Sequence, residues 1–201
     1  MIVLPTLPLR NPNITNVYVK QIFTPDQCEQ ILKSAKKDDW KAGKIGGYGG
    51  KGQFSTIATV RSMTQQRLRV RSDGFPLNVI AFEVSNFNSQ GFSFDLSGFV
   101  SDDEPWLMRY EGAKEDHYDW HIDVGPAANA SRKLGFTVQL SLPEDYDGGD
   151  LEFMNVNTKH LDLRALGSLI VFPAFRTHRV SPVTRGVRHC AVGWVHGPCF
   201  R

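Results

Sequence analysis

The second half of the chain is a series of short strand-like segments separated by turns, and this pattern constrains the fold more than any other feature of the sequence. The segments are 106–110, 136–140, 150–153, 168–172 and 187–195. Short, regularly spaced strands divided by Gly, Pro, Asp and Asn are typical of a β-sandwich or a β-barrel. We therefore expect a mainly β core beyond residue 100.

Helices are expected before that core, which makes the chain α+β. Thr24-Pro25-Asp26-Gln27 has the form of a helix start, with Thr as the N-cap and Pro at the first helical position. Apolar residues at helical spacing predict a helix over 25–37, and a second such pattern begins at Pro76 and ends near Gly91. Strand-like alternation is found at 54–60, continuing into 61–62, and at 92–96.

The length and composition are those of one globular domain. Of the 201 residues, 41% are hydrophobic and 22% are charged, and no apolar run is long enough to span a membrane. We expect a single domain over 1–201. Within it, 1–100 should provide support and substrate-side loops, and 101–198 should form the core.

The start of the chain and its cysteines suggest a compartment. Residues 1–10 lack a basic leader and contain two prolines, so we do not expect a secretory signal. The three cysteines, Cys28, Cys190 and Cys199, match no zinc signature and favour free thiols under reducing conditions. We therefore expect a cytoplasmic protein.

Four arginines form a local basic cluster: Arg61, Arg67, Arg69 and Arg71. The net charge of +2 is too small to indicate a nucleic-acid or membrane partner by itself. We interpret the cluster as a solvated strand or loop face. The alternative is a patch for an acidic or phosphate-bearing partner.

The stretch 43–52 is rich in glycine. A phosphate cradle requires a strand before the glycines and a helix after them, and neither pattern is present. We expect a mobile loop instead. If it lies near a site, it could act as a lid with Tyr48 as its large contact residue.

Two imidazoles and two carboxylates alternate in one short segment: His117, Asp119, His121 and Asp123. In an extended strand, alternate side chains point to one face, so all four could face one cavity. Ferrous iron used for oxygen chemistry requires two imidazoles and one carboxylate on one face of an octahedron. A His-x-Asp pair supplies two of these ligands, and the distant His178 offers the third. The spacing does not choose between the two pairs.

Five motifs follow one another in order between residues 106 and 194. They are Arg109-Tyr110 with Gly112, then 118–123, 143–151, 166–173 and 178–188. This ordered set resembles the catalytic core of the iron(II)- and 2-oxoglutarate-dependent dioxygenases, in the prolyl 4-hydroxylase-like branch that includes the PKHD-type hydroxylases. The resemblance implies a double-stranded β-helix, the jelly-roll fold of cupins, with supporting N-terminal helices.

The resemblance also implies a ligand set. The family pattern Tyr-x-x-His-x-Asp places the iron on His121, Asp123 and His178, which would be both the metal-binding and the catalytic residues. His117 and Asp119 are then expected as a polar pair at the rim of the pocket.

A third implication of the resemblance is 2-oxoglutarate as cosubstrate, whose far carboxylate meets a basic residue ten positions after the distal histidine, here Arg188. A guanidinium can hold a carboxylate with two parallel hydrogen bonds. Tyr110 resembles the tyrosine whose hydroxyl meets 2-oxoglutarate, whereas the competitor Arg185 lies in an expected turn and should be exposed. Strand alternation should place Val180 in the same pocket and Trp194 on the face of Arg188, as an aromatic wall.

The implied reaction is hydroxylation of a C–H bond, coupled to the conversion of 2-oxoglutarate and O2 to succinate and CO2. Fe(II) is the implied metal, and L-ascorbate is a candidate reductant. The carboxylate at Asp123 favours hydroxylation over halogenation, because a small residue there would free a site for halide.

We expect a prolyl residue of a peptide or protein as the substrate, with Arg61, Tyr118 and Trp194 on the substrate side or behind the ligands. One alternative is a free amino acid, and another is a nucleic acid, demethylated with the help of the arginine cluster. A third is a jelly-roll module that binds metal without turnover. No role is expected for the remaining histidines, His160, His189 and His196.

Overall fold

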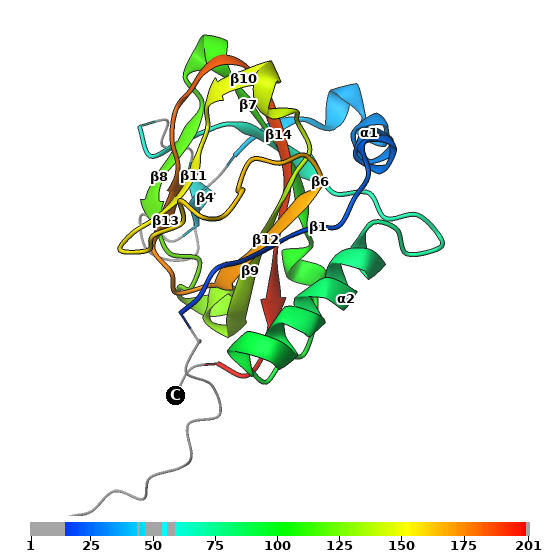
Figure 1. Cartoon of the computed structure of the whole chain (residues 1–201), viewed down its shortest axis with the longest axis vertical. Coiled ribbons are helices and arrows are strands. Elements are labelled where there is room, and N and C mark those ends of the chain that lie inside the picture. The colour runs from blue at the N-terminus through cyan, green and yellow to red at the C-terminus, as the bar shows by residue number, and fades with distance from the viewer. Residues whose placement is uncertain (1–14, 44, 47–53, 56–58, 200–201) are drawn as a thin grey trace, which may run out of the picture.

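The computed structural model describes residues 15–43, 45–46, 54–55 and 59–199, and its centre is two facing antiparallel sheets (Figure 1). In the described residues, the larger sheet has the strand order β1-β12-β9-β14-β7-β6-β2, with β10 paired to β14. The smaller sheet has the order β11-β13-β8-β5. These sheets, with few helices, confirm the expected mainly β architecture.

The larger sheet consists of β1 (Tyr18–Gln21), β2 (Lys41–Ala42), β6 (Thr64–Arg67), β7 (Trp106–Glu111), β9 (Arg132–Gln139), β10 (Tyr146–Gly148), β12 (Ser168–Pro173) and β14 (Val183–His196). The smaller sheet consists of β5 (Arg61–Ser62), β8 (His117–His121), β11 (Leu151–Phe153) and β13 (His178–Val180). A separate pair is formed by β3 (Ile45–Gly46) and β4 (Phe54–Ser55). The α-helices are α1 (Pro25–Lys33) and α2 (Leu77–Phe87).

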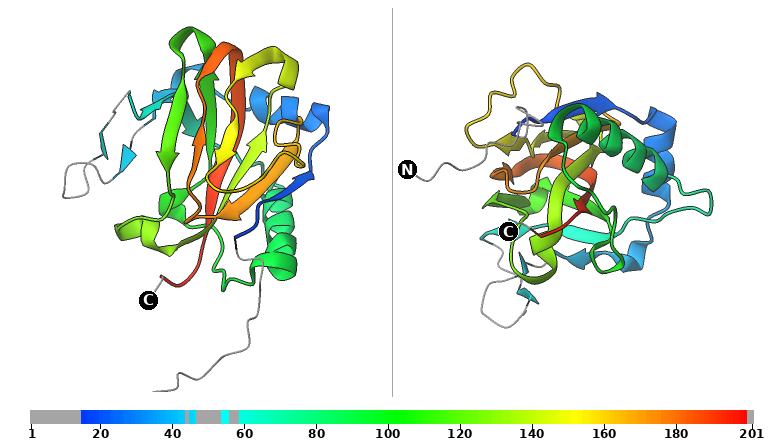
Figure 2. Two further views of the ribbon diagram at one scale, coloured as in Figure 1. Left: turned by 60° about the vertical axis from the view of Figure 1, so that its left-hand side comes forward. Right: turned by 90° about the horizontal axis from the view of Figure 1, so that it is seen from below.

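Alternate residues along β12 pack on opposite faces of the larger sheet. Leu169 and Val171 belong to the apolar cluster that includes residues of α1 and α2. Ile170 and Phe172 belong to a second cluster, which includes residues of β11 and β13. Figure 2 shows α2 lying across the outer face of the larger sheet. The inner face of this sheet and the smaller sheet therefore enclose the second cluster.

The helix expected over 25–37 begins where predicted but ends four residues early, at Lys33. The predicted N-cap is confirmed: the Thr24 hydroxyl accepts a hydrogen bond from the Gln27 backbone N–H. At the other end, the backbone N–H of Lys36 donates to the Gln66 side chain at 3.0 Å. In a longer helix this N–H would donate to the carbonyl four residues earlier. Its hydrogen bond to Gln66 replaces that helical bond, so the helix ends before this point.

The strand expected at 92–96 is wrong. α2 continues into a π-helical turn, Asn88–Phe92, and Ser93 then adopts a left-handed conformation with φ 53°. The backbone N–H and carbonyl of Phe94 both bond to the Asn88 side chain, each at 2.9 Å. This asparagine satisfies the backbone groups that a neighbouring strand would have used.

The N-terminal segments are built into both sheets, since β1, β2 and β6 extend the larger sheet and β5 extends the smaller one. Most of the glycine-rich stretch 43–52, including Tyr48, lies outside the described residues, and so does the middle of the strand expected at 54–60. No helix in the described part of the chain has the length and apolar character needed to cross a membrane.

Candidate active site

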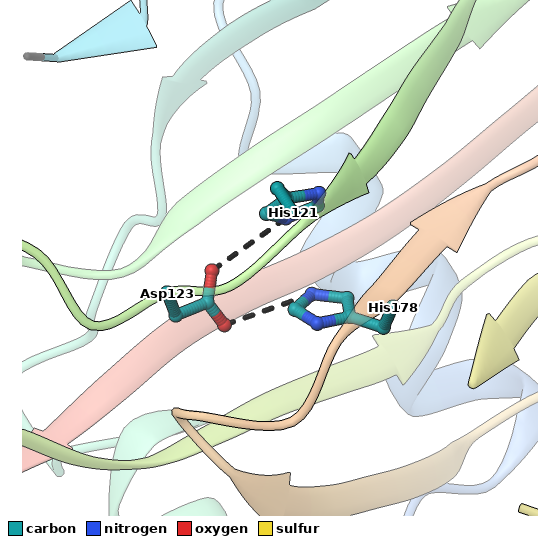
Figure 3. A group of neighbouring side chains, drawn as sticks. All are labelled: His121, Asp123 and His178. Carbon is teal, nitrogen blue, oxygen red and sulfur yellow. Dashed lines mark ion pairs between the residues drawn. The ribbon is translucent and has the colours of Figure 1, made fainter. Parts of the chain in front are cut away.

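Strand pairing in the smaller sheet brings two distant histidines together. His121 ends β8 and His178 begins β13, and the antiparallel register pairs them directly. Asp123 follows β8 by two residues, and its backbone N–H donates to the Ala174 carbonyl at 2.8 Å. Figure 3 shows the carboxylate of Asp123 facing both imidazole rings, with one oxygen directed at each.

The three side chains form a compact candidate ligand set. Nε2 of His121 lies 3.6 Å from Oδ1 of Asp123, and Nε2 of His178 lies 3.7 Å from Oδ2. The candidate donor atoms all lie within 4.8 Å of one another, and this is the metal-type cluster found in the described residues. Two imidazoles and one carboxylate on one side are the donors that non-haem Fe(II) oxygenases use. The residues present therefore fit the metal.

Backbone carbonyls orient both rings. Nδ1 of His121 lies 2.7 Å from the Asp119 carbonyl oxygen, and Nδ1 of His178 lies 2.8 Å from that of Arg176. Because a carbonyl can only accept, each Nδ1 is assigned as the N–H donor. Each Nε2 then keeps its lone pair for a metal, the arrangement by which outer contacts fix ligating histidines.

The protonation states also suit a metal site. The pKa of His121 is lowered to about 3, because burial and the neighbouring His178 both disfavour the imidazolium. Burial raises the pKa of Asp123, but His178, His121 and Arg132 outweigh it and hold that pKa below its usual range. At neutral pH the protein therefore presents a neutral imidazole and an ionised carboxylate, as metal ligation requires.

An irregularity in β8 explains why only one of the two His-x-Asp pairs joins the cluster. Tyr118 pairs with Val180 and His121 with His178, so three steps along β8 match two along β13. The extra residue reverses the alternation of faces. His117 instead contacts the backbone carbonyls of Glu115 and Thr59, and Asp119 is exposed. The expectation that all four side chains could face one cavity is therefore wrong.

Gly135 of β9 makes room for the carboxylate and was not singled out by sequence reasoning. A Cβ at this position would lie 2.9 Å from Oδ2 of Asp123 and 2.9 Å from the Phe172 ring. A glycine inside an apolar strand marks a close approach of this kind. The run Leu134-Gly135-Phe136 was thus the available signal.

A cavity of about 660 Å³ lies beside the ligand set, and residues of both sheets line it. Its lining includes the three ligand residues and five others expected from the sequence: Tyr110, Tyr118, Val180, Trp194 and Arg61. Tyr118 stacks on the His121 ring with centroids 3.5 Å apart, and the Arg61 guanidinium lies 4.5 Å from the Tyr118 ring centroid. These contacts form the part of the cavity wall next to His121.

Arg188 is fully buried on β14. Its Nη2 donates to Oε1 of Gln139 at 3.1 Å, while Nε and Nη1 have no hydrogen-bond partner among the described residues. A buried guanidinium without a carboxylate is costly, so an anionic ligand would complete this site.

The competitor Arg185 is exposed, as expected, and pairs with Asp147 at 2.7 Å. It lies within β14, however, and not in a separate turn.

Arg132 is a further residue that sequence reasoning missed. It bonds both oxygens of Asp103, at 2.7 and 2.8 Å, and donates to the Asp123 carbonyl at 3.2 Å. Its guanidinium also lies 3.5 Å from the Trp194 ring centroid. It therefore connects the Trp194 ring to the backbone of Asp123.

The histidines without an expected role lie elsewhere: His160 is exposed, His189 lies beside Trp40, and His196 contacts Ser131 and Asp103.

The chain is similar in sequence to one protein-family model and to curated relatives. The model of the 2OG-Fe(II) oxygenase superfamily matches residues 105–196. A PKHD-type hydroxylase of Janthinobacterium sp. is 31% identical over 187 residues, covering 89% of this chain and 77% of the relative, and one of Herminiimonas arsenicoxydans has the same identity and coverage.

Solved structures share the fold at low identity. A prolyl hydroxylase of Trichoplax adhaerens, in complex with a hypoxia inducible factor peptide, aligns with a TM-score of 0.67 at 14% identity, over 92% of this chain and 84% of that one. A prolyl-4-hydroxylase of Pseudomonas putida aligns with a TM-score of 0.63 at 16% identity, over 92% and 94%.

Proposed function

The chain belongs to the PKHD-type hydroxylases of the 2OG-Fe(II) oxygenase superfamily, and from this premise we propose that it hydroxylates a prolyl residue of a peptide or protein. Fe(II) would be held by His121, Asp123 and His178. The observation that carries this proposal is the convergence of these three side chains at a cavity. Tyr110 lines the same cavity, and the buried Arg188 guanidinium lies 5.3 Å from its ring centroid.

Bound at this site, Fe(II) would activate O2, the oxidant, while 2-oxoglutarate would give two electrons on conversion to succinate and CO2; one oxygen atom would enter succinate and the other the hydroxylated carbon. The protein residues bind and orient. Arg188 would anchor the far carboxylate of 2-oxoglutarate, and Tyr110 and Val180 line the cavity beside the three ligand residues. Tyr118 and Trp194 exclude water from the metal side, and Arg61 would contact the substrate.

The choice of a prolyl substrate is supported by the structures that share the fold, which include prolyl hydroxylases. A cavity of about 660 Å³ with aromatic walls is large enough for a ring on a peptide chain. A free amino acid is the alternative within the same chemistry.

The arginine cluster gives little support to a nucleic-acid substrate. Arg69 pairs with Asp39 and Arg71 with Asp73, each at 2.7 Å, and Arg67 lies over the Trp106 ring. Arg61 lies in the cavity wall. These side chains do not form one basic surface of the kind that binds phosphates. A nucleic-acid demethylase would instead show steeply salt-dependent binding to DNA or RNA.

The test is succinate formation by the full chain with Fe(II), 2-oxoglutarate, O2 and L-ascorbate, against proline-rich peptides, free proline and free lysine. The proposal predicts that a proline-rich peptide raises the rate above the uncoupled background and gains one oxygen atom on a prolyl residue. If only a free amino acid stimulates turnover, the alternative holds. If no candidate does so, the prolyl assignment loses its support.

A further inference from the structure

Tyr146 places a buried hydroxyl beside the Arg188 side chain. The tyrosine lies on β10 and is 1% exposed, and its hydroxyl has no hydrogen-bond partner among the described residues. Gly149, with φ +63°, lies between the two side chains. A Cβ there would be 3.5 Å from the Tyr146 ring and 3.0 Å from Cδ of Arg188. The tyrosine also acts on the arginine electrostatically: burial lowers the pKa of the guanidinium, but Cys190 and Tyr146 outweigh it, so that pKa is raised overall.

Nε and Nη1 of Arg188 and the hydroxyl of Tyr146 are thus buried close together, and none of them has a partner with ordinary hydrogen-bond geometry among the described residues. The Tyr146 oxygen can accept from the guanidinium, which leaves its O–H free to donate. Buried donors that remain unpaired are costly, and a protein retains them where a ligand completes the bonds. An ionised carboxylate offers two oxygens and no donor, so it complements this set. Tyr110 differs, because its hydroxyl already donates to Sδ of Met108 at 3.6 Å.

We propose that Tyr146 binds the far carboxylate of 2-oxoglutarate, with its hydroxyl donating to one carboxylate oxygen while Arg188 holds the same group. The inference rests on the proposed role of Arg188 as the anchor of the cosubstrate. It adds a residue to that anchor from the segment Tyr146-Asp147-Gly148-Gly149, which connects the two sheets.

Arg164 also contacts the tyrosine ring. The guanidinium of Arg164 lies 4.3 Å from the ring centroid, and its Nη2 donates to the Tyr146 carbonyl at 3.0 Å. The same side chain bonds the Gly148 carbonyl and the Asp150 carboxylate, at 2.8 and 2.6 Å. These contacts involve the ring face and the backbone. Tyr146→Phe therefore removes the hydroxyl and leaves the ring in place.

The test compares two ligands that differ only at the far end: 2-oxoglutarate, and 2-oxopentanoate, which carries a methyl group in place of the far carboxylate. Their affinities for the Fe(II)-loaded full chain are measured by calorimetric titration without O2. Tyr146→Phe should weaken 2-oxoglutarate binding by about 10-fold or more, as expected for a lost hydrogen bond to a charged group. Binding of 2-oxopentanoate should be unchanged.

Two further variants separate the possible outcomes. Tyr18→Phe is the matched control, because Tyr18 packs on Phe87 away from the cavity, and it should leave both affinities unchanged. Arg188→Gln should weaken 2-oxoglutarate binding more than Tyr146→Phe does. If Arg188→Gln has an effect and Tyr146→Phe has none, or weakens both ligands equally, the role of Tyr146 is overturned. If Arg188→Gln leaves 2-oxoglutarate binding intact, the anchor itself is wrong and both proposals for this end of the pocket fail.

Discussion

Gly135→Ala should displace a metal ligand by adding one methyl group. The new Cβ would lie 2.9 Å from Oδ2 of Asp123 and 2.9 Å from the Phe172 ring. Phe172 is 2% exposed and packs against Phe153, so the carboxylate is the group that can move. Reaching an ordinary contact of about 3.5 Å requires a shift of roughly 0.6 Å. Metal–ligand distances tolerate only about 0.2 Å.

We therefore expect Gly135→Ala to weaken Fe(II) binding by about 10- to 100-fold, the range reported for disturbed ligand surroundings. The affinity is measured without O2, by competition with a chromogenic chelator. Overpacking should also lower the free energy of unfolding by about 1–3 kcal/mol, measured in urea.

Gly193→Ala is the matched control. Its Cβ would meet the Phe136 ring at 2.7 Å and Pro105 at 3.0 Å, so it overpacks the core away from the ligand set. It should lose stability to a similar extent and retain its affinity for Fe(II). The reasoning is refuted if Gly135→Ala binds Fe(II) as the wild type does, or if Gly193→Ala loses the same affinity.

Three other predictions concern the ligands, the anchor and pH. Asp123→Ala should abolish Fe(II) binding and turnover, whereas Asp119→Ala should bind Fe(II) normally; the opposite result would assign the site to the other His-x-Asp pair. Arg188→Lys should raise the Kd for 2-oxoglutarate about 10-fold without abolishing binding, because an ammonium keeps the charge but not the paired donors; an unchanged Kd in calorimetric titration would contradict this. Burial, followed by Arg109, lowers the pKa of His189 to about 4. The unfolded chain therefore takes up the proton first, and stability present above about pH 6.5 should fall by about 3 kcal/mol as the pH decreases to 4. Urea unfolding of His189→Gln across this range should show a shallower fall, and an equal slope would rule the histidine out.

The candidate ligand residues could be named from the sequence because a His-x-Asp pair is local, although spacing left two such pairs open and the family resemblance selected one. His121 and Asp123 are two residues apart, and His178 belongs to a motif that can be recognised along the chain. Gly135 and Arg132 could not be found in this way. Their roles depend on how β9 lies against the end of β8, which no spacing within either segment encodes.

The strands beyond residue 100 were predictable because their side chains alternate between two buried layers. The predictions fail where a hydrogen bond from a side chain elsewhere in the chain determines the backbone conformation. Gln66 takes the Lys36 backbone N–H and shortens α1, and Asn88 bonds the backbone of Phe94 in place of a strand. An extra residue in β8 reversed the faces of His117 and Asp119. Each of these features depends on tertiary hydrogen bonds or on strand register, which the local periodicity of the sequence does not encode.

The edge strands of both sheets are short. In the described part of the chain, the larger sheet ends in β1 and β2, of four and two residues, and the smaller one in β5 and β11, of two and three. Long exposed edge strands are templates on which other chains add strands and aggregate. Edge strands this short offer an incoming chain few unpaired backbone groups. The protein can thereby resist edge-to-edge aggregation at high concentration.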